Sequence, residues 1–338
     1  MVSAIDLAER GLLPDFVLRL GIRGLLYYRL WLEGKLPTDV KVKQFADKLR
    51  KSPLAVHQDA ANQQHYEVPT GFYEASLGKR KKYSGCFWPE GTRTLDEAEE
   101  HSLRQVCERA ELVDGQRVLE LGCGWGSLSL WMAENFPNSQ IVAISNSRTQ
   151  REFIESKGFS NLKVITKDIC EFSPEGEFDR IVSIEMFEHL RNYEELFKRI
   201  SSWLKDEGKL FFHIFCHEKF PYFFETEGKT DWMGKYFFTG GQMPARKLFH
   251  EFQKDLKLEN HWEVNGTHYG KTAEAWLSLL DTNREEVIGV FSQDLDRKNS
   301  ELWYHRWRIF YMACAELFNF RSGHEWKIGH YLFSKNKS

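Results

Sequence analysis

The stretch Val118-Leu-Glu-Leu-Gly-Cys-Gly-Trp-Gly126 decides the fold of this 338-residue chain. Its apolar first half predicts a short strand over residues 117–121, which runs directly into Gly122, Gly124 and Gly126. Glycines permit a tight turn and let the backbone approach a ligand closely, and a helix that follows offers free N–H groups in its first turn. The order of strand, glycines and helix therefore predicts the first unit of a cofactor-binding α/β sheet.

Strands and helices alternate on the C-terminal side of this unit. Short apolar runs are followed by segments whose apolar residues fall on one helix face. Such strict alternation predicts a parallel, doubly wound sheet. The predicted strands are 117–121, 140–144, 162–165, 179–184 and 209–215, and the predicted helices between them are 127–135, 149–156 and 192–204.

The rest of the chain lies before, within and after this pattern. Residues 1–95 read as helical and irregular, and we expect them to close over the cofactor. An aromatic and irregular stretch at about 217–258 interrupts the pattern like an inserted lid. We therefore divide the chain into residues 1–95 and an α/β domain over 96–338. The late elements expected in that domain are strands at 261–269 and 326–333, with helices across 272–318.

Charge and hydropathy exclude several classes of partner. The formal net charge of −3 gives no general attraction to nucleic acid or to acidic membranes. No run of about 20 apolar residues predicts a helix that spans a membrane. The best candidate, residues 16–32, is interrupted by Arg19, Arg23 and Arg29, which indicates an amphipathic docking helix or, alternatively, a membrane-surface anchor. The six cysteines form no C-x-x-C pair and the N-terminus lacks a signal-peptide pattern, so we expect a cytoplasmic protein with reduced thiols and no metal site.

The residues around the glycine turn distinguish two kinds of ligand. A dinucleotide site has the spacing G-x-G-x-x-G and a carboxylate about 20 residues later, whereas this chain has G-x-G-x-G and Ser145-Asn146-Ser147 at that place. Glu120 also stands two residues before the first glycine. These details disfavour a nucleotide-dependent dehydrogenase. After the third strand, Asp168 could meet an adenine amino group or cap the next turn, and Gln150 could bond a ribose or be an exposed helix residue.

The densest group of ionisable side chains is Glu185-Met-Phe-Glu188-His189, at the end of the fourth predicted strand. Ligands of open parallel sheets bind at that edge. If the segment begins a helix, residues 185, 188 and 189 share one face. Two carboxylates and an imidazole at a pocket mouth could bind an amine and take its proton. The alternative is that one carboxylate caps a helix and the other side chains are solvated.

Two further polar groups have simpler explanations. His213 and His217 have the spacing of an H-x-x-x-H metal pair, but they span a strand end without an evident carboxylate ligand, so strand or pocket-wall histidines are favoured. The basic run Lys79-Arg80-Lys81-Lys82 is expected to be a solvated loop rather than a phosphate-binding patch.

Distinctive short motifs run in order from about residue 62 to the end of the chain. They are His65-Tyr-Glu-Val-Pro, Tyr83-Ser-Gly-Cys-Phe-Trp, Thr94-Leu-Asp-Glu-Ala-Glu, the glycine turn, Asn146-Ser147-x-x-Gln150, Ile184-Glu-Met-Phe-Glu-His-Leu-Arg-Asn-Tyr193, His213-Ile-Phe-Cys-His217, Tyr236-Phe-Phe-Thr-Gly-Gly, Trp262-x-x-Asn-Gly-Thr-His268-Tyr and Gly323-His-Glu-Trp326. With these motifs the chain resembles the superfamily of cyclopropane fatty-acid synthases and plant coclaurine-type N-methyltransferases. It is more similar to the N-methyltransferases.

The resemblance implies a fold, a cofactor and a reaction. The fold is the class I Rossmann-like methyltransferase fold, a mostly parallel seven-stranded sheet closed by a late pair of strands. The cofactor is S-adenosyl-L-methionine, and the reaction is methylation of the nitrogen of a small aromatic or alkaloid-like amine. The alternative is a cyclopropane-synthase-like enzyme that modifies unsaturated acyl chains. We expect a monomer or homodimer with no nucleic-acid partner and no stable membrane insertion.

The resemblance also implies roles for single residues. Glu185 and Glu188 bind the amine and His189 removes its proton, while Tyr83 and Ser84 belong to a flap over the cofactor. The other expected substrate contacts are Glu67, His213 and Trp326, and the other expected cofactor contacts are Glu120, Gly122, Gly124, Gly126, Asn146, Gln150, Asp168, Ile169 and Ile184.

Two positions depart from the cyclopropane synthases. The cysteine that binds bicarbonate after Tyr-Ser in those enzymes is replaced by Gly85, with Cys86 one residue later. A tyrosine that they keep near the C-terminus falls at Phe310 or Ile309, beside Tyr311. Both departures weaken the lipid alternative.

Overall fold

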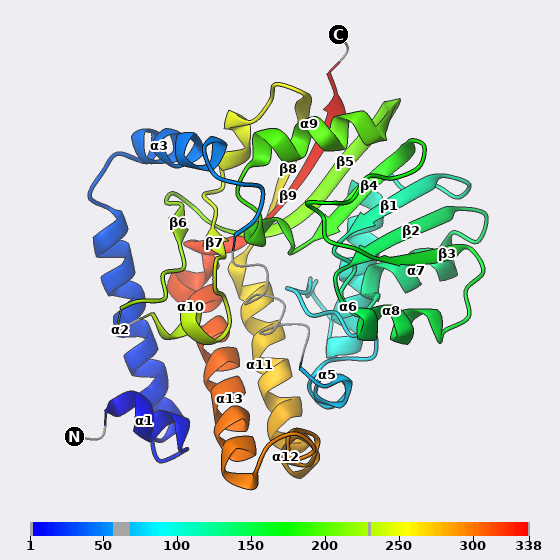
Figure 1. Cartoon of the computed structure of the whole chain (residues 1–338). Helices are drawn as coiled ribbons and strands as arrows, with labels where there is room; N and C mark the ends of the chain where they lie inside the picture. Colours follow the sequence, from blue (N-terminus) through cyan, green and yellow to red (C-terminus); the bar gives the residue numbers. More distant parts are fainter. Residues whose placement is uncertain (1–2, 57–67, 229–230, 337–338) are drawn as a thin grey trace.

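The computed structural model describes residues 3–56, 68–228 and 231–336. Its centre is a seven-stranded sheet with the strand order β3-β2-β1-β4-β5-β9-β8 (Figure 1). The strands are β1 (Arg117–Leu121), β2 (Gln140–Ser145), β3 (Leu162–Thr166), β4 (Phe178–Ile184), β5 (Leu204–His217), β8 (Leu256–Val264) and β9 (Trp326–Lys335). Strands β1 to β5 are parallel, and β9 runs antiparallel between β5 and β8. The predicted fold class is confirmed.

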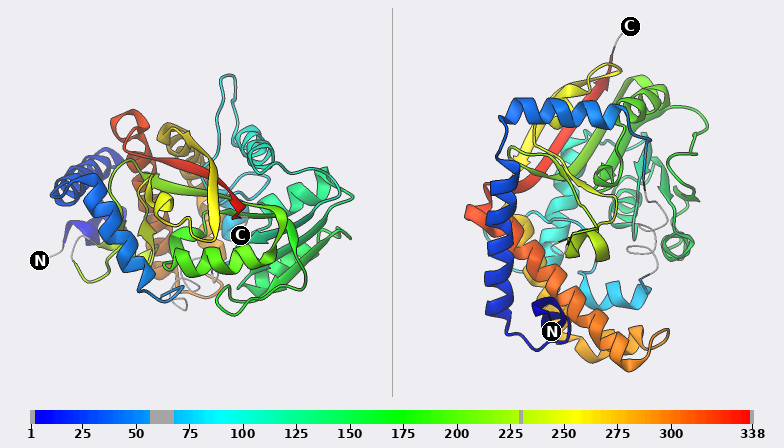
Figure 2. Two further views of the ribbon diagram at one scale, coloured as in Figure 1. Left: turned by 90° about the horizontal axis from the view of Figure 1, so that it is seen from above. Right: turned by 60° about the vertical axis from the view of Figure 1, so that its left-hand side comes forward.

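Helices cover both faces of this sheet, as the view from above shows (Figure 2). Side chains of a strand alternate between its two faces. Leu119 and Leu121 accordingly pack in one core with α9, whereas Val118 packs in another with α6. The flanking helices are α6 (Leu95–Arg109), α7 (Ser127–Asn135), α8 (Arg148–Glu155) and α9 (Tyr193–Trp203), and α3 (Thr38–Arg50) joins the α9 side. The sheet is therefore held between two apolar layers, with its strand ends left for a ligand.

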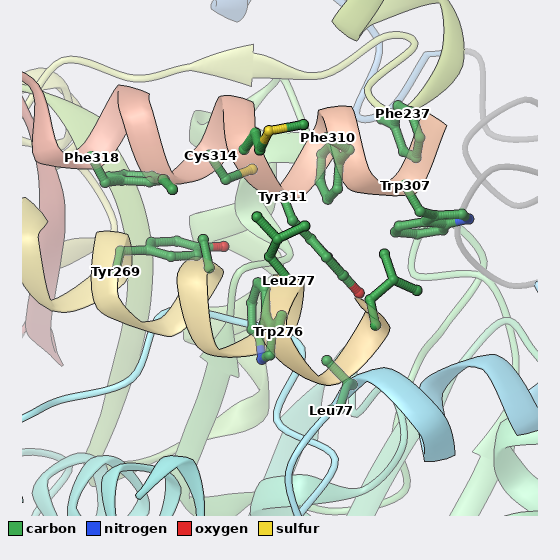
Figure 3. Packing of buried hydrophobic residues seen from close by; sticks show 14 of the residues in the cluster. Leu77, Phe237, Tyr269, Trp276, Leu277, Trp307, Phe310, Tyr311, Cys314 and Phe318 are labelled. Carbon is green, nitrogen blue, oxygen red and sulfur yellow. The ribbon is translucent and has the colours of Figure 1, made fainter. Parts of the chain in front are cut away.

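A second group of helices packs beside the sheet through aromatic rings (Figure 3). It consists of α11 (Gly266–Thr282), α12 (Arg284–Phe291) and α13 (Arg297–Asn319), with the short α5 (Thr70–Ser76) against α11 and α12. Tyr269 of α11 stacks on Phe318 of α13 with ring centroids 4.0 Å apart. Offset aromatic pairs add about 0.5–1.5 kcal/mol beyond the area they bury. This packing fixes the ring of Tyr269 relative to the sheet.

The N-terminal helices lie along the outer side of α13 (Figure 1). They are α1 (Ala4–Glu9) and α2 (Asp15–Glu33), and α2 is the amphipathic helix expected over 16–32. Arg19 and Arg23 of α2 both donate to Glu316 of α13. The other side of α2 leaves Phe16 and Trp31 more than 60% exposed. Among the described residues, no helix combines the length and the apolar composition that crossing a membrane requires.

The chain between β5 and β8 forms short elements instead of a further α/β unit. They are a two-stranded sheet of β6 (Tyr222–Phe223) and β7 (Gln242–Met243), helix α10 (Trp232–Tyr236) and the 3-10 turn η2 (Leu248–Glu251). Phe237 of this segment stacks on Phe310 of α13, with centroids 4.4 Å apart. The segment therefore packs against the aromatic helices rather than extending the sheet.

One predicted strand is wrong in its position. The sequence predicts a strand over 261–269, but β8 occupies Leu256–Val264 and α11 begins at Gly266. Asn265 ends the strand because its side-chain oxygen accepts from the Thr267 N–H at 2.9 Å and so caps the helix. This shift moves Tyr269 from a strand onto a helix.

Candidate active site

A cavity opens at the carboxyl ends of β1 and β4, where parallel sheets bind their ligands. The glycine turn after β1, the flap before α6, the end of β4 and rings from α11 and α13 surround it. The structure brings together many of the sequence-predicted residues here. Those that line the cavity are Tyr83, Ser84, Glu120, Gly122, Gly124, Gln150, Ile184, Glu185 and His189.

The three glycines of the turn have different structural reasons. Gly124 has a φ of +52°, and a Cβ at this position would meet no protein atom within 4 Å. A Cβ at Gly122 would lie 2.6 Å from Met186, and a Cβ at Gly126 would lie 2.6 Å from Ile154. Gly124 is thus the glycine that leaves room for a ligand, whereas the other two permit close protein packing. Gly126, an expected cofactor contact, lies outside the cavity lining.

Polar groups beside this turn fit a ligand with several hydrogen-bonding atoms. The hydroxyl of Ser127 is buried on the cavity wall and has no hydrogen-bond partner among the described residues. Helix α7 begins there without a side-chain cap, so its first N–H groups are available to a ligand. The carboxyl of Glu120 accepts from the hydroxyl of Ser129, and burial raises the pKa of Glu120 to about 8. A buried orphan hydroxyl and a buried carboxyl suit a polar cofactor at this turn.

Gln150 lies on the same wall and is buried, unlike the exposed helix residue that was the alternative. Its Oε1 accepts from the hydroxyl of Ser145 at 2.7 Å, and its backbone N–H donates to Ser147 Oγ at 3.3 Å. These bonds hold the amide side chain in one place beside the glycine turn.

Several expected contacts do not line the cavity. Asn146 is exposed, and Ile169 packs at the edge of the α9-side core. Asp168 accepts from the Cys170 N–H at 2.6 Å, which is the turn cap that the sequence left open as an alternative. Glu67 lies outside the described residues.

Glu185 is where three parts of the chain converge. It directly follows β4 and has a φ of 45°, in the left-handed region that a non-glycine residue rarely adopts. Its Oε1 accepts from the Gly85 N–H at 3.0 Å and lies 3.0 Å from His213 Nε2. Its Oε2 accepts from the hydroxyl of Tyr269 at 2.7 Å. Expected as a substrate contact, His213 instead lies behind the carboxylate and does not line the cavity.

Burial dominates the ionisation of this carboxyl. It raises the pKa of Glu185 to about 7, against the positive charge of Lys82 and the hydrogen bonds from Gly85 and Tyr269. Burial, with the charge of Glu185 added to it, raises the pKa of Glu188 far above its ordinary value. Of the pair, Glu185 is therefore the carboxyl that ionises as the pH rises through neutrality, while Glu188 stays protonated.

The predicted helical face of residues 185, 188 and 189 is wrong. The backbone turns at Glu185, and residues 187–189 form a single 3-10 turn. Glu188 consequently points into the protein, where its Oε1 accepts from the Phe215 N–H at 3.1 Å. It is fully buried and is not among the residues that line the cavity. Glu185 and His189 remain on the wall.

His189 faces the cavity from the 3-10 turn. Its ring stacks on Phe238 of the segment between β5 and β8, with centroids 4.8 Å apart and an interplanar angle of 24°. Both residues line the same cavity as Glu185. A stacked imidazole is held in orientation, and imidazole is the side chain that exchanges protons most readily near neutral pH.

Aromatic rings form much of the rest of the wall, but Trp326 is not one of them. Trp326 has no exposed surface, and its Nε1 donates to the hydroxyl of Tyr222 at 3.0 Å in the core. The start of β9 lies at the same edge of the sheet as the cavity, because Trp326 pairs with His217 at the end of β5, but the indole packs against His217 and Phe320 and does not line the cavity. The rings that do line the cavity are Tyr73, Tyr83, Trp125, Phe215, Phe238, Tyr269, Trp276 and Phe310, of which Tyr269, Trp276 and Phe310 appear in Figure 3.

Sequence reasoning missed Lys82, which was expected in a solvated loop. Its side chain is 1% exposed, and Nζ donates to Ser84 Oγ at 2.7 Å and to the Gly85 carbonyl at 2.6 Å. The flap thus carries its own buried cation beside Glu185. The signal was the position of Lys82 directly before the Tyr83-Ser84 motif. Tyr269 was missed because the sequence assigned it to a strand, although it stood in a recognised motif.

The histidine spacing does not make a metal site. His217 Nδ1 accepts from the backbone N–H groups of Lys219 and Phe220. Among the described residues, no three His, Cys, Asp or Glu side chains gather as metal ligands. All six cysteines are described, and none of them forms a disulfide bond.

Comparisons with known proteins agree with this geometry. Residues 55–328 match the family described as mycolic acid cyclopropane synthetase. (S)-Coclaurine N-methyltransferase of Thalictrum flavum subsp. glaucum is 36% identical, with 99% of this chain and 96% of the relative aligned. Cyclopropane-fatty-acyl-phospholipid synthase of Escherichia coli K12 is 27% identical over 78% of this chain and 66% of its own.

Solved structures show the same ranking. A coclaurine N-methyltransferase bound to N-methylheliamine and SAH matches with a TM-score of 0.93 and 34% identity, covering 97% of this chain and 98% of the other. The cyclopropane synthase MmaA2 from Mycobacterium tuberculosis matches with a TM-score of 0.71 at 21% identity, covering 84% of this chain and all of the other. The second likeness concerns the fold alone.

Proposed function

The chain belongs to the mycolic acid cyclopropane synthetase family, and from its likeness to coclaurine N-methyltransferases we propose that it methylates the nitrogen of a small, apolar, aromatic amine. The cofactor is S-adenosyl-L-methionine, which supplies an electrophilic methyl group when bound. One observation carries the proposal: Glu185 presents a buried carboxyl group, held by the Gly85 N–H and the Tyr269 hydroxyl, to a cavity walled largely by aromatic rings.

Glu185 and the rings suit an ammonium group. An aliphatic amine is mostly protonated near neutral pH, and a buried carboxylate attracts that cation strongly because little water screens it. Aromatic faces add about 0.5–2 kcal/mol to the binding of a cation. Together they select a substrate that is positively charged at one atom and apolar elsewhere.

The protonated amine has no lone pair, so a base must act before attack. His189 lies on the wall that Glu185 shares, and its stacking on Phe238 fixes the direction of the ring. We assign it the removal of the ammonium proton. Holding nucleophile and methyl group in line within an enclosed site supplies much of the remaining acceleration.

The residues that would hold the cofactor are those of the glycine turn and its surroundings. Gly124 leaves space for a close backbone approach, while Glu120, Ser127 and Gln150 offer polar atoms on the same wall. Tyr83 and Ser84 lie across the cavity on the flap. We propose that residues 1–95 serve as a cover through this flap, and that the protein is a cytoplasmic monomer or homodimer.

Gly85 supports the amine over an acyl chain as the acceptor. A Cβ at this position would lie 2.7 Å from the ring of Tyr269 and 2.6 Å from Ile328. The place of the bicarbonate-binding cysteine in the resembling synthases is therefore closed by packing. Tyr269 and the Gly85 N–H instead both bond to Glu185.

Mass spectrometry with isotopically labelled S-adenosylmethionine tests the function. A panel of secondary and tertiary aromatic amines, with N-methylheliamine among them, is compared with vesicles of an unsaturated phospholipid. We expect labelled methyl on amine nitrogen and none on the acyl chains. In Glu185→Gln, which keeps size and removes charge, methylation of the amines falls. Labelled acyl chains with unlabelled amines would reverse the assignment.

His189→Ala tests the base through its pH dependence. Loss of a positioned base costs about 10²–10⁴ in rate, so kcat falls by that range at neutral pH while KM changes less. Activity should recover as the pH approaches the pKa of the free amine, because the substrate then arrives without its proton. Steady-state kinetics across pH measures this recovery. A wild-type kcat at neutral pH would show that the proton leaves by another route.

A further inference from the structure

A row of polar side chains crosses the sheet behind Glu185. In the strand register, His213 of β5 pairs with His330 of β9, and His330 pairs with Trp262 of β8. Arg109, the last residue of α6, covers this row, with its guanidinium carbon 5.3 Å from the centre of the Trp262 ring. The cavity wall is thus connected to a helix on one face of the sheet.

Hydrogen bonds join these residues into one chain. Arg109 Nη1 lies 2.8 Å from His330 Nδ1, His330 Nε2 lies 3.1 Å from His213 Nδ1, and His213 Nε2 lies 3.0 Å from Glu185 Oε1. The separation of Arg109 from His330 is 221 residues, so only the fold brings them together.

Arginine fixes the direction of every bond in this chain. A guanidinium has donors and no acceptor. His330 must therefore accept at Nδ1, which leaves its proton on Nε2 to donate to His213. By the same reasoning, His213 accepts at Nδ1 and donates from Nε2 to Glu185. Both imidazoles are neutral Nε2–H tautomers whose N–H groups point toward the carboxylate.

The charge of Arg109 reinforces this arrangement. Arg109 is half-buried, and no carboxylate of the described residues lies within 4.0 Å of its guanidinium. Burial lowers the pKa of His213 and of His330 far below the ordinary value, and the charge of Arg109 lowers both further. Proton gain by either imidazole is thus opposed, and Glu185 is the member of the chain that can titrate near neutral pH.

We infer that Arg109, His330 and His213 are positioning residues that hold Glu185 as an anion in one orientation. A reversed chain would turn the lone pair of His213 toward the carboxylate and favour its protonated form. Arg109 prevents this reversal from the far side of the sheet. The inference rests on the proposed function only where it concerns the amine.

Other ionisable groups also face this chain and must stay constant in its test. They are Lys82 and Tyr83 of the flap, Glu188 of the 3-10 turn, Tyr269 of α11, Cys314 of α13 and His261 of β8. A substitution at Arg109 leaves each of these side chains in place. Its effect on Glu185 therefore reports on the hydrogen bonds from Arg109 through the two histidines.

Nitrogen-15 NMR of the histidine rings tests the chain without any turnover. In the wild type we expect His213 and His330 as neutral Nε2–H tautomers from about pH 5.5 to 8. Arg109→Met, similar in length but without charge or donor, should give at least one of them a different or mixed tautomer. Arg109→Lys restores a donor and should restore the wild-type signals. Arg104→Met is the matched control, because Arg104 is exposed on the same helix.

Amine binding across pH provides the second measurement. Affinity for the ammonium rises as the pH climbs through about 7, where Glu185 ionises. In Arg109→Met this rise in affinity, the pH limb, should shift to higher pH by about one unit. In Arg109→Lys it should return toward the pH of the wild type. Arg104→Met should leave it unchanged.

The two measurements can refute the proposed function and the inference about Arg109 independently. If no amine binds, the proposed function fails while the tautomer signals still decide the chain. If Arg109→Met lowers the Tm but keeps both tautomers and the pH limb of the wild type, Arg109 only stabilises the end of α6 and the inference is wrong. If Arg109→Met does not fold, Arg109→Lys and His330→Gln are compared for the same tautomer and the same limb.

Discussion

At the scale of single residues, Gly124→Val should separate ligand space from backbone strain. A β-branched residue at its φ of +52° is strained by about 1–3 kcal/mol, and its branches would enter the cavity. We expect binding of S-adenosylhomocysteine to weaken at least tenfold by calorimetry. Gly158→Val is the control, because Gly158 also has positive φ and open space but does not line the cavity. Equal affinity in the two variants, both folded, would refute a cofactor at this turn.

The role of a residue could be predicted where it depends on the local sequence pattern. It could not be predicted where it depends on one backbone dihedral angle. The turn with Gly124 and the strand-end position of Glu185 follow from the order of strand and glycines. Glu188 faces the core because Glu185 adopts a φ of 45°, which no periodicity announces. Lys82 is buried because Ser84 and the Gly85 carbonyl accept from it, and these partners appear only when the flap is folded.

At the scale of elements, the attachment of α2 to α13 should depend on Glu316. Its side chain is 7% exposed and accepts from Arg19 and Arg23. Glu316→Ala leaves both guanidiniums without this acceptor, and we expect a loss of about 1–3 kcal/mol in the free energy of unfolding, reduced because Arg23 is half-exposed. Hydrogen exchange should rise throughout α2 before it rises in the sheet.

Glu301→Ala on the same helix is the control for that prediction. Glu301 pairs with Arg297 across one helical turn, and both side chains are largely exposed. Exposed pairs of this kind contribute about 0.3–0.5 kcal/mol. If both variants leave exchange in α2 unchanged, apolar contacts alone hold this helix in place.

Element types could be predicted more reliably than their limits. The strands and helices of residues 117–215 follow from apolar alternation and from helical spacing. The strand predicted at 261–269 is wrong because the hydrophobic pattern continues across Asn265, the residue that caps α11. Capping is decided by one side chain bonding to one backbone group, and this bond does not change the hydrophobic pattern on either side.

At the scale of the whole molecule, alternation predicted the parallel sheet, but long-range pairing assembled the site. Arg109, His213 and His330 lie on a helix and two strands that come together only in the finished sheet. Pairing between distant strands leaves no local signal in either one. Glu185 could therefore be placed at the strand end from the sequence, whereas the hydrogen-bonded residues behind it could not.

The place of β9 between β5 and β8 also has a consequence during synthesis of the protein. Residues 326–335 emerge more than 100 residues after β5 has been made. At about 5–20 residues per second, a ribosome needs roughly 5–20 seconds to cover that distance. Throughout this delay the nascent β5 presents an apolar edge with no partner, which is the kind of edge that recruits other chains. We therefore expect the growing polypeptide to be prone to aggregation until β9 is inserted beside β5.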